Sequence, residues 1–395
     1  MMILSDDIKQ FIEKNKDVDI HQLLLSKHNL PNDKLKFAVQ QIEGRQRIQY
    51  KLPSWYVLPD IVYPVHLSLE QCSSEATASY KSSLISGESL VDLTGGYGID
   101  TTLFAQNFQK LIYVEQNREL AEIVTHNFGV FGLNNVQVII GRAEHVLEGM
   151  DAVDQIFIDP ARRDIGGGKL VSITDCVPDV TKMQEEFKKK AKGAMIKLSP
   201  MLDLKQALRE LDNVSEVHIV ALNNECKELL MITNYADNRV GEPTIYCTNL
   251  LANHKDIYQF RLSEEESLNI DYVSKLDQYL YEPNVALLKA GAYSSISRSF
   301  NLKKLHPNTH LYTSNEKCVN FPGRKFKIEE IFNFNKKSIK QLKASVSKVN
   351  ITIRNFPSSV DDLRKKLKMS DGGDMYLFAT TLSKNEKVLV LCSKI

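Results

Sequence analysis

The chain has 395 residues and a net charge of +1; 43% of its residues are hydrophobic and 25% are charged, as in globular proteins of about two to four domains. No apolar run reaches the roughly 18 residues that a membrane-spanning helix needs, and the polar N-terminal stretch lacks the pattern of a secretory signal. The six cysteines are scattered without a CxxC pair, and no HExxH motif occurs, so we expect free thiols, a cytoplasmic location and no metal site.

Residues 1–80 have the periodicity of helices, with a break at Pro31 and Asn32. The stretch 52–64, LPSWYVLPDIVYP, is aromatic and spaced by prolines, which favours an extended backbone. Ser73 and Ser74 are typical of residues that cap the start of a helix. The N-terminal part is therefore predicted to be a helical region.

Between residues 81 and 278, short β-rich runs alternate with helical segments. The strand candidates are 89–93, 110–115, 136–140, 155–159, 193–198, 215–222 and 228–233. Helices fit between the first five runs, which predicts parallel strands, and the short NNECK segment predicts an antiparallel hairpin between the last two. The pattern indicates an α/β domain with a seven-stranded, mostly parallel sheet, whose ligands would bind at the carboxyl ends of the strands.

The C-terminal part begins with two further β-like runs, TIYCTNLL and DIYQFRL, and a helical segment at 282–300. We expect a small separate segment at 279–321 and a last domain at 322–395. That domain is predicted to contain strands at 326–334 and 348–355, helices at 336–346 and 360–368, and a terminal pair of strands.

The stretch LVDLTGGYGIDTTLFA, residues 90–105, joins the first strand to a helix through a glycine-rich loop. A phosphate-binding P-loop is excluded because Ile99 follows the last glycine instead of lysine, and a dinucleotide fingerprint lacks its third glycine at Thr101.

The same loop fits the D/E-x-G-x-G-x-G pattern of S-adenosylmethionine sites. Asp92 suits the ammonium group of that cofactor, and Thr94 occupies the place of the first glycine. Gly96 and Gly98 allow the backbone to approach a ligand closely.

Three other strand ends carry groups that suit the same ligand. Glu115 ends the second strand, where a carboxylate can bind both ribose hydroxyls, and Ala143 and Glu144 follow the third strand, near the expected adenine. Asp159 and Pro160 follow the fourth strand, over the reactive face. The coincidence of four strand ends predicts an S-adenosylmethionine site.

The chain resembles the class I S-adenosylmethionine-dependent methyltransferases, which have a Rossmann-like fold. It is most similar to a bacterial family that joins this domain to a THUMP-like C-terminal domain through a small ferredoxin-like segment. The resemblance lies in SLEQCSSEATASYK, VDLTGGYGID, DPARRD, YEPNVALLKAGAY and ITIRNFPSSVDDLRKKLKMSDGGDMYLFAT, and covers the chain from about residue 50. It implies S-adenosylmethionine as cofactor and RNA as the substrate class.

The candidate catalytic residues are Asp159, Pro160 and Arg162. Asp159 could act as a base or could position the acceptor. Arg162 stands where enzymes that methylate base amines commonly have an aromatic residue, which disfavours that acceptor without excluding it. The fifth strand ends in IKLSP without a cysteine, so we expect direct transfer without a cysteine nucleophile.

Positive charge gathers at the C-terminal end. Residues 322–368 contain thirteen Lys/Arg and four Asp/Glu, a net charge of +9, which leaves −8 for the remainder of the chain. This asymmetry indicates a polyanionic partner. The candidate RNA-binding residues are Arg163, Lys325, Lys336, Lys337, Lys340 and Arg354. Arg163, together with Lys169 and the glycines at 166–168, forms either a phosphate site or a solvated loop.

The sequence thus predicts a monomeric S-adenosylmethionine-dependent methyltransferase that acts on tRNA or rRNA, without a membrane or a metal. Two alternatives stay open: an RNA- or ribosome-binding protein that has the same fold with little catalysis, and a methyltransferase for proteins or small molecules. The phenylalanines among the C-terminal lysines recur at strand spacing, which favours a core position for them over contact with RNA.

Overall fold

The computed structural model describes residues 4–28, 30–162, 172–237 and 241–395. The chain divides into two compact units, residues 1–217 with 227–243, and residues 218–226 with 244–395. In the described part of the chain, no helix is both long and apolar enough to cross a membrane.

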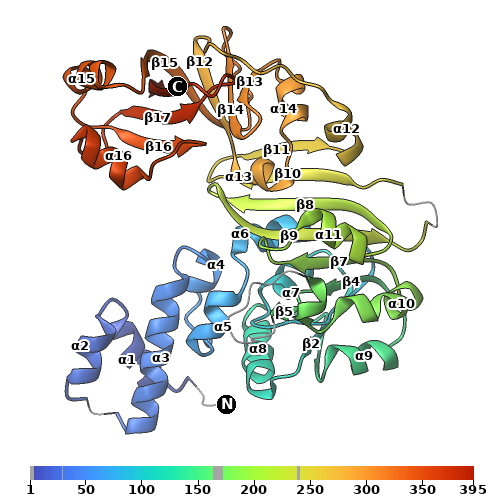
Figure 1. The fold of residues 1–395 in the computed structure, drawn as a ribbon. Helices are drawn as coiled ribbons and strands as arrows, with labels where there is room; N and C mark the ends of the chain where they lie inside the picture. Colours follow the sequence, from blue (N-terminus) through green and yellow to red (C-terminus); the bar gives the residue numbers. More distant parts are fainter. Residues whose placement is uncertain (1–3, 29, 163–171, 238–240) are drawn as a thin grey trace. The chain divides into compact units, whose positions relative to one another are not determined.

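The N-terminal region is helical, as predicted (Figure 1). Its helices are α1 (Asp6–Asn15), α2 (Ile20–Leu25), α3 (Asn32–Ile48), α4 (Pro53–Tyr56), α5 (His66–Gln71) and α6 (Glu75–Ser82). The prediction of an extended backbone at 52–64 is wrong at its start, because α4 turns Trp55 into the core between the rings of Tyr97 and Phe131. Ser74 caps α6, its hydroxyl accepting from the amide of Thr77.

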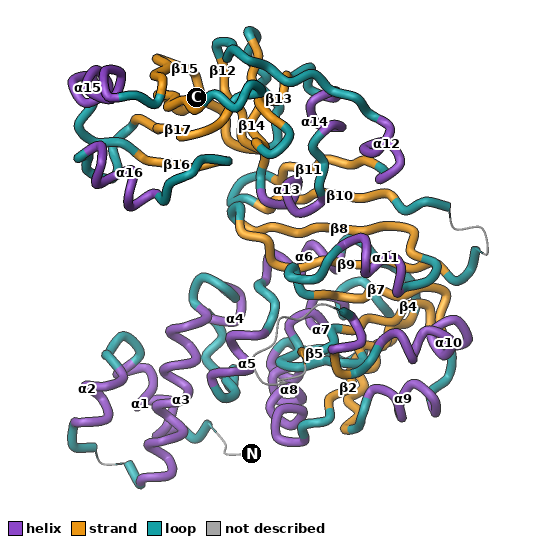
Figure 2. The backbone as a smooth tube through the Cα atoms, in the orientation of Figure 1, coloured by secondary structure: helices purple, strands orange, loops and turns teal. Residues whose placement is uncertain are grey.

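A large mixed sheet follows (Figure 2). Five of its strands are parallel: β1 (Ser89–Asp92), β2 (Lys110–Glu115), β3 (Val136–Ile140), β4 (Val153–Ile158) and β7 (Ala191–Leu198). The predicted hairpin is β8 (Val214–Leu222) and β9 (Glu225–Asn234), and β9 runs antiparallel to β7. Asn223 and Asn224 form its two-residue turn, both with positive φ.

The sheet has nine strands instead of the predicted seven. Its order is β11-β10-β8-β9-β7-β4-β1-β2-β3, where the additional strands are β10 (Thr244–Leu250) and β11 (Lys255–Phe260). These are the two β-like runs beyond the hairpin. They extend the sheet because β8, as an edge strand, would present unpaired amide and carbonyl groups that β10 can bind.

The connections between these strands are the expected helices and one small hairpin. The helices are α7 (Ile99–Phe104), α8 (Arg118–Val130), α9 (Ala143–Gly149), α10 (Val180–Lys190) and α11 (Leu204–Glu210). The hairpin is β5 (Ala161–Arg162) with β6 (Cys176–Val177), and the 3-10 turn η1 (Ile173–Asp175) precedes β6.

The second unit contains a seven-stranded sheet of its own, in the order β13-β14-β12-β15-β18-β17-β16. Its strands are β12 (Tyr279–Pro283), β13 (Lys303–His306), β14 (Thr309–Ser314), β15 (Gly323–Asn333), β16 (Asn350–Arg354), β17 (Met375–Thr381) and β18 (Lys387–Lys394). Its helices are α12 (Leu262–Ser267), α13 (Val285–Ala290), α14 (Ser294–Ser299), α15 (Lys336–Ser345) and α16 (Val360–Leu367).

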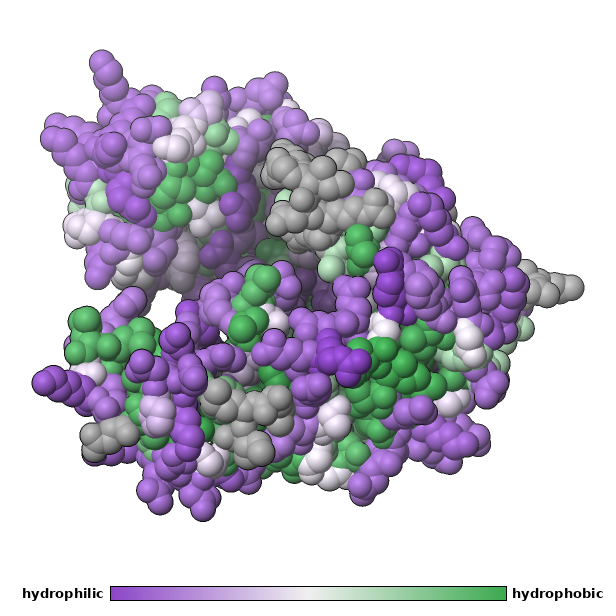
Figure 3. All heavy atoms as spheres, turned by 90° about the horizontal axis from the view of Figure 1, so that it is seen from below, coloured by the Kyte–Doolittle hydropathy of each residue, from purple (hydrophilic) through white to green (hydrophobic). Residues whose placement is uncertain are grey.

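This second sheet is buried on both faces. Leu389 and Leu391 of β18 pack in one apolar cluster with Leu342 of α15, whereas the alternate residues Val388 and Val390 pack in another with Phe326. The period of two shows that the clusters lie on opposite faces of the sheet. Phe326 is a core residue, as predicted. The face of the molecule drawn in Figure 3 is largely hydrophilic, with apolar side chains in separate patches.

Candidate active site

The glycine loop after β1 requires its glycines for two different reasons. A Cβ at Gly95 would lie 2.0 Å from the Tyr113 ring, and a Cβ at Gly98 would lie 2.8 Å from Val124. Gly96 and Gly98 also have φ values of +52° and +76°, which disfavour side chains. A Cβ at Gly96 would meet nothing closer than 3.9 Å, so this glycine borders open space.

Asp92 and Thr94 hold the loop against the ends of the neighbouring strands. Asp92 is only 1% exposed; its carboxylate accepts from the Thr94 amide at 3.1 Å and from the Thr101 hydroxyl at 2.6 Å. Burial, together with the charges of Asp100 and Asp159, raises the pKa of Asp92 to about 7. The Thr94 hydroxyl accepts from the Asp159 amide at 2.6 Å, so it links the ends of β1 and β4.

Glu115, at the end of β2, reaches back to the loop. One oxygen accepts from the Gly96 amide at 3.1 Å and the other from the Asn117 amide at 2.8 Å. Glu144, at the start of α9, forms an exposed ion pair with Arg142 at 3.3 Å.

A cavity of about 860 Å³ lies along these strand ends. Its lining includes nine predicted residues: Asp92, Thr94, Gly96, Gly98, Glu115, Ala143, Glu144, Asp159 and Pro160. They come together because parallel strands present their carboxyl ends at one edge of the sheet. Arg162 ends β5, but its side chain, like the whole of Arg163, Lys169 and the glycines at 166–168, lies outside the described residues.

Asp159 is paired with a lysine that the sequence analysis did not single out. Lys197, near the end of β7, donates to Asp159 Oδ2, and both residues line the cavity. Burial acts to lower the pKa of Lys197, but the carboxylates of Asp159, Glu228 and Asp100 outweigh it and raise that pKa. Lys197 is therefore charged at neutral pH.

A second ion pair, which is buried, lies close by. Lys81 of α6 is fully buried and binds Glu228 of β9 at 2.8 Å and Asp100 at 3.1 Å. The Ser73 hydroxyl accepts from Lys81 at 2.9 Å and donates to Asp100 at 2.7 Å. Sequence analysis missed this group, for which the available indication was Glu228, a charged residue directly before the apolar run LLMIT.

Two cysteines, Cys72 and Cys176, also line the cavity. Burial raises the pKa of the Cys72 thiol, which disfavours the thiolate that a nucleophile requires. All six cysteines are free thiols, as predicted.

In the second unit, the predicted RNA-binding residues divide into two kinds. Lys336, Lys337 and Lys340 are exposed on α15. Lys325 donates to the Val319 carbonyl at 2.7 Å, and Arg354 binds the buried Glu282 at 2.6 Å, so both take part in local structure.

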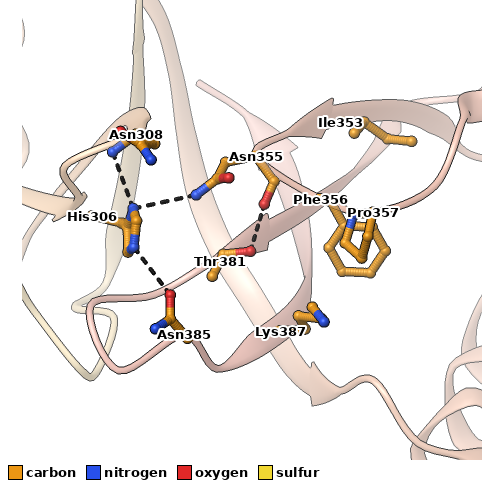
Figure 4. A pocket seen from close by; sticks show the side chains of 9 residues that line it. All are labelled: His306, Asn308, Ile353, Asn355, Phe356, Pro357, Thr381, Asn385 and Lys387. Atoms are coloured by element: carbon orange, nitrogen blue, oxygen red, sulfur yellow. Dashed lines mark hydrogen bonds between the residues drawn. The ribbon is translucent and has the colours of Figure 1, made fainter.

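The second unit also has a cavity of about 660 Å³ (Figure 4). On one side His306 Nδ1 accepts from the Asn308 amide at 3.0 Å and faces Asn355 Nδ2 at 3.2 Å, which places the ring proton on Nε2, toward Asn385. Phe356 and Pro357 lie on the other side. Lys387 is part of the lining, which includes no carboxylate.

Comparison with known proteins gives matches along the whole chain. A family model described as a THUMP domain-like domain matches residues 323–394, and one described as a ferredoxin-like domain matches residues 279–322. No curated protein matches. A crystal structure from Porphyromonas gingivalis W83, described as a "putative methyltransferase", is 36% identical, with a TM-score of 0.89 and coverage of 100% of both chains.

Two other solved structures match about the same share of the chain. An rRNA methylase from Streptococcus thermophilus is 15% identical over 40% of this chain and 93% of its own, with a TM-score of 0.29. A Streptococcus mutans structure in complex with SAH is 12% identical over 40% of this chain and 96% of its own, with a TM-score of 0.30.

The strand order, the glycine loop and the full-length likeness to the Porphyromonas protein agree with one another. The predicted resemblance and fold class are confirmed, apart from the number of strands. This chain belongs to the class I methyltransferase family that carries a ferredoxin-like segment and a THUMP-like domain.

Proposed function

We propose that this protein is an S-adenosylmethionine-dependent methyltransferase that modifies tRNA or rRNA by direct transfer. The observation that carries the proposal is the cavity at the strand ends, in which the carboxylates of Asp92 and Glu115 and an open glycine loop lie beside the Asp159–Lys197 pair. Residues 81–278 would form the catalytic domain and residues 322–395 the RNA-binding domain.

The residues present fit S-adenosylmethionine. A volume of about 860 Å³ is within the usual range for small-molecule sites, and the open side of Gly96 leaves room for a ligand against the backbone. Asp92 and the glycine loop would hold the amino acid part, Glu115 the ribose, and Ala143 with Glu144 the adenine. When bound, this cofactor supplies a methyl group on a positively charged sulfur.

RNA as the substrate class is supported by the second unit. Residues 322–368 carry a net charge of +9, and three lysines of α15 are exposed. The match to a THUMP-like model covers the same residues. The rest of the chain, at −8, would repel phosphate on average, so the C-terminal domain is the part suited to capture a polyanion.

Calorimetry with S-adenosylhomocysteine tests the cofactor site. The variant Glu115→Ala removes a carboxylate that would bind two hydroxyls, at a cost of about 1.5–3 kcal/mol, or roughly a 10- to 150-fold weaker affinity. Glu119→Ala is the matched control, because Glu119 is exposed on α8 and does not line the cavity. Equal affinity of the wild type and Glu115→Ala, or no binding by the wild type, contradicts the proposal.

A further inference from the structure

Two ion pairs lie beside each other at the end of the fourth parallel strand. Lys197 donates to Asp159, and Lys81 binds Glu228. The four side chains come from four separate parts of the chain, α6, the segment after β4, β7 and β9. The charge of Glu228 also acts on Lys197, so the two pairs are electrostatically connected.

The two pairs differ in their access to the cavity. The side chains of Lys197 and Asp159 are 14% and 35% exposed and line it, whereas those of Lys81 and Glu228 are 0% and 3% exposed and do not. Oδ2 of Asp159 is bound by Lys197, while Oδ1 has no partner among the residues that the structure describes. The Asp159–Lys197 pair, which we call the front pair, therefore presents a carboxylate oxygen and an ammonium group to whatever enters the cavity.

Stability alone gives a poor account of this arrangement. A buried ion pair often contributes no more to stability than apolar residues of the same size would. Charged groups held together in a cleft are a common feature of sites where protons move.

The front pair distinguishes between two kinds of methyl acceptor. An amine nitrogen gains positive charge as it takes a methyl group, and a neighbouring ammonium group such as that of Lys197 would oppose this. A hydroxyl oxygen must lose its proton while the new bond forms, because a protonated ether is a very strong acid. A carboxylate can take that proton and an ammonium group can stabilise the oxygen that is left.

Building on the proposed function, we propose that the acceptor is a ribose 2′-hydroxyl of RNA, with Asp159 and Lys197 as the catalytic residues. The 2′-hydroxyl is the aliphatic hydroxyl that recurs at each nucleotide within an RNA chain. Asp159 Oδ1 takes the proton of the hydroxyl, and Lys197 stabilises the negative charge that develops on the oxygen. The O–H bond breaks and an O–CH₃ bond forms; the electron pair of the broken carbon–sulfur bond stays on sulfur, and Asp159 then returns the proton to solvent.

The position of the methyl group tests this proposal. Total RNA from a strain that lacks the protein is incubated with the full chain and S-adenosylmethionine, digested to nucleosides and examined by mass spectrometry. We expect methyl groups on ribose. Asp159→Asn and Lys197→Met should each lower the rate roughly 100-fold or more, and Lys197→Arg, which keeps a cation, should retain more activity than Lys197→Met.

A second readout does not depend on activity. Asp159→Asn and Lys197→Met should bind S-adenosylhomocysteine within about threefold of the wild type, which also shows that they fold; a large loss of that affinity overturns their assignment to the acceptor. Lys192→Met is the matched control on the same strand, because Lys192 is exposed and pairs with Asp154. Its rate should equal that of the wild type.

The outcomes separate this inference from the proposed function. Methyl groups found on bases alone overturn the ribose assignment and leave an RNA methyltransferase. Ribose methylation that persists in Asp159→Asn overturns the role of Asp159. Binding of S-adenosylhomocysteine without modification of any RNA refutes the RNA substrate, and the ribose assignment falls with it.

Discussion

At the scale of single residues, Asp92 makes stability depend on pH. Its pKa is about 7 in the folded chain against 3.8 when unperturbed, because burial disfavours its charge. Below about pH 4 it is protonated in both states; between there and pH 7 the unfolded chain binds fewer protons, so stability falls as pH rises. Relative to Asp92→Asn, the wild type should lose at most about 4 kcal/mol across this window, as measured by urea unfolding at several pH values.

Asp154 provides the control for that experiment. A hydrogen bond from Lys192 and one from the Ser89 amide lower its pKa to about 2. Its contribution to stability is present above pH 3.8 and is lost only as the pH falls toward 2. The difference between wild type and Asp154→Asn should therefore be flat from pH 5 to 8. If Asp92→Asn behaves in the same way, the Asp92 carboxylate is not buried as described.

At the scale of elements, one buried ion pair joins α6 to β9. Replacing Lys81 by Met leaves the carboxylates of Glu228 and Asp100 without their cation, which should cost about 3–5 kcal/mol of unfolding free energy. The double variant Lys81→Met with Glu228→Leu should recover part of this loss. Denaturant unfolding of the two single variants and the double variant measures the coupling.

An ion pair at the start of α10 has an exposed cation and serves as a comparison. Lys182 binds Asp179 at 3.1 Å, but its side chain is 79% exposed. Lys182→Met should change the unfolding free energy by less than about 1 kcal/mol. A loss as large as that of Lys81→Met would mean that burial does not decide the cost.

At the scale of the whole molecule, charge is divided between the C-terminal domain at +9 and the rest at −8. Reversing Lys336, Lys337 and Lys340 to Glu should weaken RNA binding. It should also flatten the dependence of log affinity on log salt by roughly 0.7–0.9 for each phosphate that the variant no longer binds. A salt titration with total tRNA measures both quantities, and affinity for S-adenosylhomocysteine should stay unchanged.

The same number of reversals on α10 is the matched control for charge alone. Lys182, Lys188 and Lys189 lie on a surface helix of the first unit, each beside an acid of its own helix or of its cap. Their change to Glu should leave the salt slope as in the wild type. Coinciding slopes for the α15 variant and the wild type would mean that the basic face of α15 is only solvated.

Sequence alone determined the strands, the glycine loop and the strand ends that line the cavity. The seven runs of the first sheet reappear as strands because apolar periodicity is a local property of the chain. Asp92, Glu115 and Asp159 could be placed together because each ends a strand of one parallel sheet, where topology leaves little choice.

The tertiary structure alone decided the nine-stranded sheet and the partners of the charged groups. Lys81 and Glu228 are 147 positions apart, and Lys197 is 38 positions from Asp159, so no local pattern joins either pair. A charge buried inside a fold must have a partner, but that partner is chosen by which elements pack side by side. For this reason the cofactor loop could be predicted from the sequence, whereas the Asp159–Lys197 pair, which we propose to select the acceptor, could not.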